Sequence, residues 1–142
     1  MESPKRIKVG LMGLGVVGSG VAATLLEDSD VLSQKAGGGI ELTKVLVSNL
    51  TKRRPSIVSQ DIITDNPLDI LEDPSIDVVV EAIGGEEPAY SYISKAIDKR
   101  KHVVTANKEV MAKHGSELIE KAGANRVNLL FEASVGGGIP II

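Results

Sequence analysis

The chain has 142 residues, a length that suits a single domain built around one hydrophobic core. Its net charge of −3 gives no reason to expect a nucleic-acid partner or an anionic membrane surface. There is no cysteine, which excludes a disulfide framework and thiolate chemistry, and we expect a protein of a reducing, cytoplasmic compartment.

The first predicted unit is a strand that leads into a helix through a glycine-rich turn. Residues 7–12, IKVGLM, are a short apolar run that ends at the turn 13–18, GLGVVG. Beyond this turn Val17, Val21 and Leu25 recur every four residues, which is the spacing of one helical face.

The same stretch allows a second interpretation. Residues 7–26 are mostly apolar and follow the basic pair Lys5-Arg6, so they resemble a membrane span or a secretory signal. The stretch also contains Lys8 and five glycines, and the spacing of these glycines favours the strand, turn and helix.

The rest of the chain alternates between predicted strands and helices. After a surface loop that includes Gly37-Gly38-Gly39, we expect strands at 41–49, 61–65, 77–85, 102–106 and 127–133. We expect a brief helix from Asn66-Pro67, a helix from Glu86 to about Lys101 and a helix from Asn107 to Ala122, with Gly123 as its stop. The run 77–85 is rich in β-branched residues, as in a strand buried on both faces of a parallel sheet. This alternation predicts an α/β fold with a doubly wound parallel sheet of about six strands.

The glycine turn has the G-x-G-x-x-G pattern, and its position between a strand and a helix makes it informative. In a Rossmann-type dinucleotide-binding domain Gly13 permits the tight turn, Gly15 lets the backbone approach a pyrophosphate, and Gly18 lets the helix pack close to the strand. The helix N-terminus would attract the phosphates. We therefore expect Gly13, Leu14, Gly15, Val16, Val17 and Gly18 to contact the cofactor. The alternative is a glycine-rich turn in another kind of α/β domain.

The end of the second strand bears on the choice of cofactor. NAD-binding domains place an acidic residue there for the adenosine ribose, whereas this chain has Ser48 and Asn49. The run Lys52-Arg53-Arg54 follows, and such side chains suit a 2′-phosphate. We expect Ser48, Arg53 and Arg54 to bind NADP, with NAD use possible; the alternative is a solvated basic loop.

Three further loops lie at the carboxyl ends of predicted strands, the edge where open α/β sheets bind ligands. They contain Ile83-Gly84-Gly85, Thr105-Ala106-Asn107-Lys108 and Ser134-Val135-Gly136-Gly137. Lys108 sits at a helix N-terminus, which is unfavourable for a cation and indicates a use; the alternative is an ordinary exposed lysine. Asn107 is interpreted as a helix cap.

His102 and His114 do not have the spacing of metal ligands. We expect them to be surface or packing residues.

With these motifs placed, the chain resembles the amino-terminal part of homoserine dehydrogenase over essentially its whole length. The motifs that carry the resemblance are GLGVVGSGV, VVVEAIGG, VVTANKEVMAKHG and FEASVGGGIPII, in that order. The resemblance implies reduction of L-aspartate 4-semialdehyde to L-homoserine with NADPH or NADH, on the route to threonine and methionine. It implies cofactor contacts by the glycine turn, Thr105 and Lys108, and we add Ile83 and Gly84 from the neighbouring loop. It also implies a catalytic role for Lys108, between nicotinamide and substrate.

The resemblance further implies a sodium site. It maps onto the carboxylate of Glu132 and the carbonyl oxygens of Val135, Gly137 and Ile139. Hard oxygen ligands of this kind suit such a cation.

Members of this family continue for some hundreds of residues beyond the part that the chain resembles. We therefore expect residues 1–142 to be the nucleotide-binding domain of a longer homodimeric enzyme, inactive without its substrate and dimerisation domain. The start at Met1-Glu2-Ser3-Pro4 suggests that no aspartate kinase domain precedes it. Two alternatives remain: a different dehydrogenase of a small amino-acid-derived aldehyde, and a stand-alone nucleotide-binding or sensing module.

Overall fold

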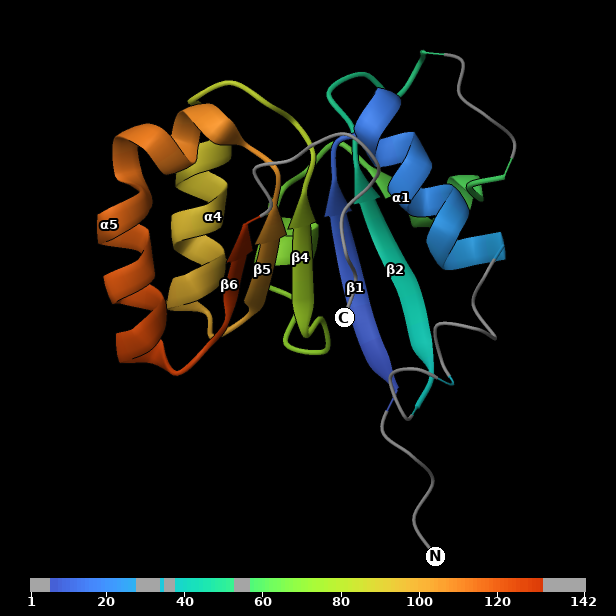
Figure 1. Cartoon of the computed structure of the whole chain (residues 1–142). Coiled ribbons are helices and arrows are strands. Elements are labelled where there is room, and N and C mark those ends of the chain that lie inside the picture. Colours follow the sequence, from blue (N-terminus) through green and yellow to red (C-terminus); the bar gives the residue numbers. More distant parts are fainter. Residues whose placement is uncertain (1–5, 28–33, 35–37, 53–56, 132–142) are drawn as a thin grey trace, which may run out of the picture.

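The computed structural model describes residues 6–27, 34, 38–52 and 57–131, and the fold is built from these. In chain order its elements are β1 (Ile7–Met12), α1 (Val16–Glu27), β2 (Ile40–Leu46), the 3₁₀ helix η1 (Gln60–Ile62), β3 (Ile63–Thr64), α3 (Leu68–Leu71), β4 (Val78–Glu81), α4 (Ala89–Asp98), β5 (His102–Thr105), α5 (Lys108–Asn125) and β6 (Leu129–Phe131). Figure 1 shows this alternation of strands and helices along the chain.

The six strands form one parallel sheet in the order β3-β2-β1-β4-β5-β6, which confirms the predicted fold class. The order reverses between β1 and β4, so the chain builds one half of the sheet outward from β1 and then the other half from β4. The carboxyl ends of the six strands lie along the upper edge of the sheet in Figure 1. Ligands of doubly wound sheets bind at such a reversal.

The register aligns the last residues of the strands in one row along this edge. Met12 pairs with both Leu46 and Glu81, Glu81 pairs with Thr105, and Thr105 pairs with Phe131. Loops that leave the strands from this row therefore start side by side.

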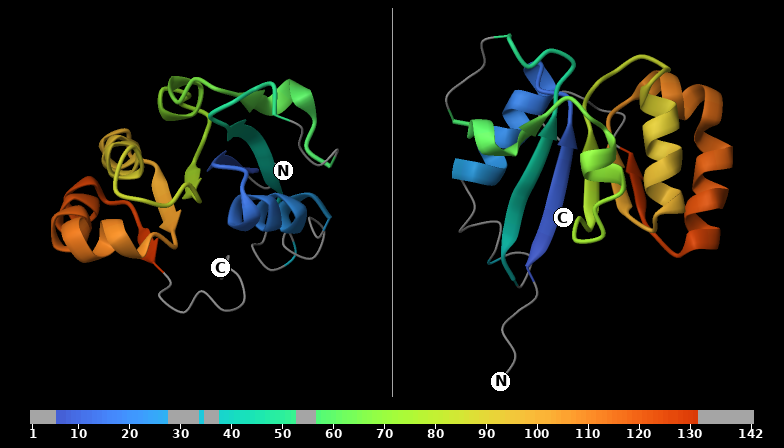
Figure 2. Two further views of the ribbon diagram at one scale, coloured as in Figure 1. Left: turned by 90° about the horizontal axis from the view of Figure 1, so that it is seen from above. Right: turned by 180° about the vertical axis from the view of Figure 1, so that it is seen from behind.

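Each face of the sheet carries its own hydrophobic cluster. On one face, α3, α4 and α5 bury residues such as Ile70, Ile93 and Leu118. On the other face, α1 packs Val21 and Leu25 against β1 and β2. Figure 2 shows α1 and α3 on opposite sides of the sheet when it is seen from above. Because both faces are covered, the strands β1 and β4 are almost entirely apolar, as the sequence indicated.

Several predicted boundaries differ from the structure by a few residues. The strands expected at 41–49 and 77–85 end at Leu46 and Glu81, because the residues that follow turn away at the carboxyl edge. The helix expected from Glu86 begins at Ala89, yet an acid still serves its first turn, since the Glu87 carboxylate accepts hydrogen bonds from the N–H and the hydroxyl of Ser91. Residues 132 and 133 of the last predicted strand lie outside the described residues.

The prediction that Gly123 stops α5 is wrong, because the helix continues to Asn125. Arg126 adopts the left-handed conformation (φ 59°), its N–H bonds the carbonyl of Gly123, and the N–H of Val127 bonds the carbonyl of Ala122. This is the Schellman arrangement, in which the residue after the left-handed one is apolar and packs on the helix. Val127 is partly buried against the core, so its packing fixes the helix end.

The end of α4 repeats this arrangement with an unexpected residue. Arg100 has φ 60°, and the N–H of the following Lys101 bonds the carbonyl of Ala96. Lys101 is thereby only 3% exposed, and its ammonium donates to the carbonyls of Asp73 and Ile76. Burial lowers the pKa of Lys101. The helix predicted to run to about Lys101 ends earlier, at Asp98.

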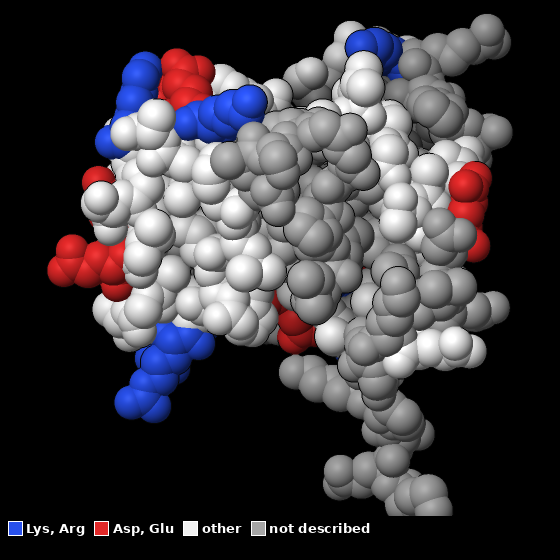
Figure 3. Space-filling view, viewed as in Figure 1, with Lys and Arg blue, Asp and Glu red and all other residues white. Residues whose placement is uncertain are grey.

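The described part of residues 7–26 belongs to the folded domain, as β1 in the middle of the sheet and α1 upon it. No described helix has both the length and the apolar character needed to cross a membrane. On the face shown in Figure 3, acidic and basic side chains lie beside one another at the upper left corner, over α4 and α5.

Candidate cofactor site

A cleft of about 580 Å³ lies at the carboxyl edge, at the reversal between β1 and β4. Its volume is within the range of small-molecule sites, roughly 300–1,000 Å³. Three segments supply most of its lining, namely the glycine turn, the end of β2 with the loop after it, and the loop after β4; Asp65 after β3 and Tyr92 of α4 complete it. The lining residues are Gly13, Leu14, Gly15, Leu46, Val47, Ser48, Lys52, Asp65, Ala82, Ile83, Pro88 and Tyr92. The cleft therefore brings together Gly13, Leu14, Gly15, Ser48 and Ile83 from the cofactor residues predicted from sequence.

Two positions of the turn require glycine for the chain's own packing. Gly13 has φ 102°, and a β-carbon there would lie 2.8 Å from the carbonyl oxygen of Ala82. A β-carbon on Gly18 would overlap the carbonyl group of Gly13. These contacts hold the start of α1 tightly between β1 and the loop after β4, as the motif predicts.

Gly15 differs from both, because a β-carbon there would meet no atom of the described residues within 4 Å. It lines the cleft, and the next residue, Val16, is 96% exposed. The first helical bond of α1 runs from the Ser19 N–H to the Gly15 carbonyl, so the N–H groups between them have no acceptor within the helix. No acidic side chain occupies this first turn. The open, positively polarised helix end suits the phosphates of a dinucleotide.

The loop after β2 forms another wall. Ser48 and Lys52 line the cleft there, and the position next to Ser48 is Asn49 rather than an acid. The Asn49 side chain accepts hydrogen bonds from the N–H and hydroxyl of Thr51, at 2.9 and 2.7 Å, so it shapes the loop. Asp65, which follows β3, also lines the cleft. Arg53 and Arg54 lie outside the described residues.

The third wall depends on Glu81, which the sequence analysis passed over. This last residue of β4 is 1% exposed. Its carboxylate accepts hydrogen bonds from the N–H groups of Ile83 and Gly84, at 2.8 and 3.1 Å, and from the Thr105 hydroxyl at 2.5 Å. The sequence signal was an acid at the end of an otherwise apolar strand, a position that is buried when the sheet is covered on both faces.

Thr105, Asn107 and Lys108 stand together where β5 passes into α5. Thr105 is fully buried, and its hydroxyl oxygen accepts from the Asn107 N–H at 3.0 Å. The Asn107 side-chain oxygen accepts from the Val110 N–H at 3.1 Å, which confirms the predicted cap. Lys108 is the first residue of α5 and is exposed, and its ammonium has no hydrogen bond or ion pair with another described residue.

Some of the predicted cofactor residues do not line the cleft. These are Val16, Val17, Gly18, Gly84, Thr105 and Lys108. A cofactor contact by any of these residues stays a prediction. Gly84 nevertheless adjoins the lining residue Ile83, and its φ of 81° places it in the left-handed region, where glycine is favoured.

Both histidines have packing roles, as predicted. The Nδ1 atom of His102 accepts the Asn128 N–H at 3.0 Å. The His114 ring stacks on Tyr90 with centroids 3.9 Å apart, and its Nε2 lies 2.8 Å from the Glu86 carboxylate. Hydrogen bonds from His114 and then Lys113 lower the pKa of Glu86.

Within the described ranges, no group of three or more His, Cys, Asp and Glu side chains could hold a metal ion. The sodium ligands implied by the resemblance, Glu132, Val135, Gly137 and Ile139, all lie beyond residue 131, outside the described residues.

Comparison with known proteins identifies the family. Residues 13–132 match the family model described as homoserine dehydrogenase, NAD binding domain. The chain belongs to the homoserine dehydrogenase family. It is 46% identical to the homoserine dehydrogenase of Bacillus subtilis and 43% identical to that of Pseudomonas aeruginosa, over 97% of this chain in each case. A homoserine dehydrogenase structure from Thiobacillus denitrificans superimposes with a TM-score of 0.88 at 42% identity, covering 96% of this chain.

The chain covers only part of these homoserine dehydrogenases: 32% of the Bacillus protein, 31% of the Pseudomonas protein and 32% of the Thiobacillus chain. It corresponds to their NAD-binding domain, and a nicotinamide dinucleotide is its cofactor. The cleft fits such a ligand in its chemistry. The N–H groups near Gly15, which have no acceptor within α1, match the pyrophosphate, and no described residue fills the space beside Gly15.

Proposed function

We propose that this domain binds NADPH in preference to NADH, and that within a full-length cytoplasmic, homodimeric homoserine dehydrogenase it holds the cofactor for reduction of L-aspartate 4-semialdehyde to L-homoserine. The observation that carries the proposal is the cleft itself. One wall is the open end of α1 beside Gly15. Another contains Ser48 and Lys52, and Ser48-Asn49 stands where an NAD-specific domain would carry an acid.

The preference for NADPH follows from charge. Lys52 lines the cleft, and Arg53 and Arg54 follow it directly in sequence. Guanidinium groups bind phosphate through paired hydrogen bonds, so they favour the cofactor that carries a 2′-phosphate. Asp65 opposes this preference, because a carboxylate in the same cleft repels the phosphate.

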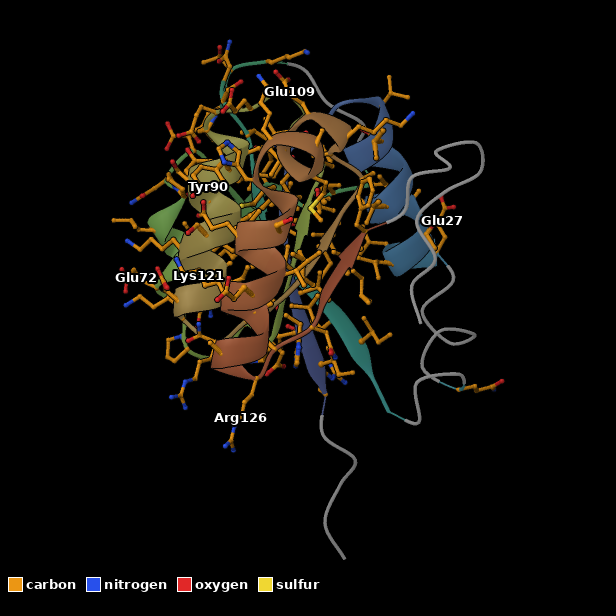
Figure 4. The ribbon with its side chains drawn as sticks, turned by 60° about the vertical axis from the view of Figure 1, so that its left-hand side comes forward. Glu27, Glu72, Tyr90, Glu109, Lys121 and Arg126 are labelled. Atoms are coloured by element: carbon orange, nitrogen blue, oxygen red, sulfur yellow. The ribbon has the colours of Figure 1, made fainter. Side chains whose placement is uncertain are left out.

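Titration of purified variants with each cofactor tests the preference. Changing Arg53 and Arg54 together to Ala is expected to weaken NADPH binding and to leave NADH binding nearly unchanged. Arg126→Asn is the matched control. It removes an exposed positive charge at the far end of α5 from Glu109 (Figure 4), and asparagine tolerates the left-handed conformation that Arg126 adopts. Equal losses for both cofactors would refute the 2′-phosphate assignment.

Lys108 is proposed to act on the substrate. A bound NADPH would supply hydride to the C4 carbonyl carbon of the substrate, and negative charge would then develop on the carbonyl oxygen. The Nζ ammonium of Lys108, exposed at the start of α5, would bind the substrate carboxylate or donate a proton to that oxygen. In a full-length enzyme, Lys108→Ala is expected to lower kcat and to leave the Kd for NADPH unchanged.

We also propose that the 142-residue chain alone binds the cofactor and does not catalyse the dehydrogenase reaction. Positioning of reactants contributes about 7–11 kcal/mol to a well-oriented reaction, and this chain is about a third of the length of its relatives. An assay with L-homoserine and NADP over many hours decides this. Turnover of roughly 1 per second or more would contradict it.

The proposal includes a sodium ion held by Glu132 and the carbonyls of Val135, Gly137 and Ile139 in the full-length enzyme. Replacing sodium with choline in the assay buffer is expected to lower activity. The Glu132→Ala variant is expected to lose the response to sodium.

A further inference from the structure

We propose that Glu81 is a positioning residue that fixes the loop after β4 as a hydrogen-bond-accepting wall of the cofactor cleft and ties this wall to the start of α5. The cofactor part of this proposal rests on the proposed function, whereas the effect of Glu81 on the loop does not. The strand, the loop and the helix involved are all described.

The partners of Glu81 are what set it apart from an ordinary buried acid. Within the described residues its carboxylate contacts no cation; it accepts from the N–H groups of Ile83 and Gly84 and from the hydroxyl of Thr105. The Asn107 amide is at 3.5 Å, the outer limit of a hydrogen bond. Every partner thus lies in the loop after β4 or in the passage from β5 to α5.

The two backbone contacts decide what the loop presents to a ligand. A trans peptide holds its N–H and C=O groups antiparallel, so when the N–H groups of Ile83 and Gly84 point at Glu81, the carbonyls of Ala82 and Ile83 point away from it. The Ala82 carbonyl indeed lies against the glycine turn, 2.8 Å from where a β-carbon of Gly13 would be. Both Ala82 and Ile83 line the cleft.

The two facing walls of the cleft therefore differ in polarity. The wall beside Gly15 offers N–H donors and a positive helix end, which bind phosphate. In the loop after β4, Glu81 occupies the N–H donors of Ile83 and Gly84, so this stretch offers carbonyl acceptors with a carboxylate behind them. Such a wall repels phosphate and accepts hydrogen bonds from ribose hydroxyls or a carboxamide N–H. This difference sets which part of a dinucleotide lies against which wall.

The same carboxylate also fixes the position of Lys108. The Thr105 hydroxyl that donates to Glu81 accepts the N–H of Asn107. Asn107 in turn donates from its side chain to the Gly85 carbonyl at 2.7 Å and caps α5. Lys108 is the next residue. Loss of Glu81 would release the loop and the start of α5 together.

A purely structural role for Glu81 makes a different prediction from a positioning role. If the carboxylate only stabilised the fold, its removal would lower the free energy of unfolding and leave the Kd of the folded protein unchanged. If it sets the loop, the folded variant binds cofactor less tightly and the Ile83 and Gly84 amides change their environment.

The test compares the chain with its Glu81→Gln variant, which keeps the shape and removes the charge. At a temperature where both are fully folded, the Kd for NADPH is expected to rise about tenfold, the cost of one weakened charge-assisted hydrogen bond. In ¹H–¹⁵N spectra the amide protons of Ile83 and Gly84 are expected to move upfield, because they lose a charged acceptor. Lys101→Met is the matched control: it removes a buried charge that binds backbone groups at the opposite edge of the sheet, and both readouts should stay unchanged.

Thr105→Val keeps the experiment decisive if Glu81→Gln does not fold. It removes one donor to Glu81 at nearly constant shape, and a Kd increase of about threefold, with recovery in Thr105→Ser, supports the proposal. A folded Glu81→Gln variant with unchanged Kd and unmoved amides overturns it, as does an unchanged Kd in Thr105→Val. Should the unmodified chain bind neither NADPH nor NADH, the proposed function fails, and the amide shifts alone then decide whether Glu81 sets the loop.

Discussion

Substituting Gly15 with valine isolates cofactor binding from folding. A β-carbon at Gly15 meets no atom of the described part of the chain within 4 Å, and the φ of Gly15 lies outside the left-handed region, so this part of the protein accommodates a larger side chain. We expect the free energy of unfolding to change by about 0.5 kcal/mol or less, as for other surface substitutions. The new side chain would instead fill the space that the pyrophosphate approaches.

The size of the binding loss follows from the contacts that this side chain prevents. Hydrogen bonds to charged groups contribute about 1.5–3 kcal/mol each, and at least two N–H groups at the start of α1 have no acceptor within the helix. Losing two such bonds weakens binding by about 3–6 kcal/mol, which is roughly 10²- to 10⁴-fold in Kd. NADPH and NADH should lose equally, because both carry the pyrophosphate.

Isothermal titration calorimetry with each cofactor measures this loss, and urea unfolding checks the fold. Gly20→Ala is the matched control, since Gly20 is also in α1 and a β-carbon there also meets nothing within 4 Å. It should raise the free energy of unfolding by up to about 1 kcal/mol and leave both Kd values unchanged. If Gly15→Val binds either cofactor within about threefold of the unmodified chain, where at least 10²-fold is expected, the pyrophosphate does not lie at this turn.

Three other predictions concern charged residues. Lys108→Ala should raise the free energy of unfolding in a urea titration by about 0.5 kcal/mol, because it removes a cation from the positive end of α5; a loss of stability would refute the idea that Lys108 is retained at a cost. Lys101→Met should lower that free energy by about 2 kcal/mol, since the buried Ile76 carbonyl loses its donor, and identical urea midpoints would contradict this. The folded pKa of Glu86 lies below its ordinary 4.5, so its contribution is present above pH 4.5 and is lost as the pH falls through the folded pKa. Glu86→Gln should therefore lose less stability than the unmodified chain between pH 7 and pH 3, and parallel pH profiles would exclude the pairing with His114.

The local pattern of the chain was enough to predict the sheet and the glycine turn. The run IKVGLM and the β-branched run at Val78–Glu81 have the composition of strands covered on both faces, and they lie within the ranges predicted for them, 7–12 and 77–85. The cap at Asn107 is likewise set by residues within one helical turn. Structural features that are set by residues close together in sequence can be predicted without knowing which distant residues they contact.

Glu81 and Lys101 escaped prediction because their surroundings come from distant parts of the chain. Glu81 accepts a hydrogen bond from the hydroxyl of Thr105, and Lys101 donates hydrogen bonds to the carbonyls of Asp73 and Ile76. The prediction of where α5 ends failed for a related reason. A rule based on glycine favoured Gly123, whereas the helix ends where Val127 can enter the core.

The covering of the sheet by α1 has a consequence for the lifetime of the domain. Among the described α-helices, only α1 packs on the face formed by Val9, Leu11 and Val45, and the glycine turn that leads into this helix lines the cleft. A bound cofactor therefore holds down the helix that shields this half of the core from water. At a ligand concentration 100 times Kd, the folded state gains about 2.7 kcal/mol. Amide hydrogens of β1, β2 and α1 should then exchange more slowly than those beneath α4, and the cellular cofactor pool would set how fast proteases degrade the domain.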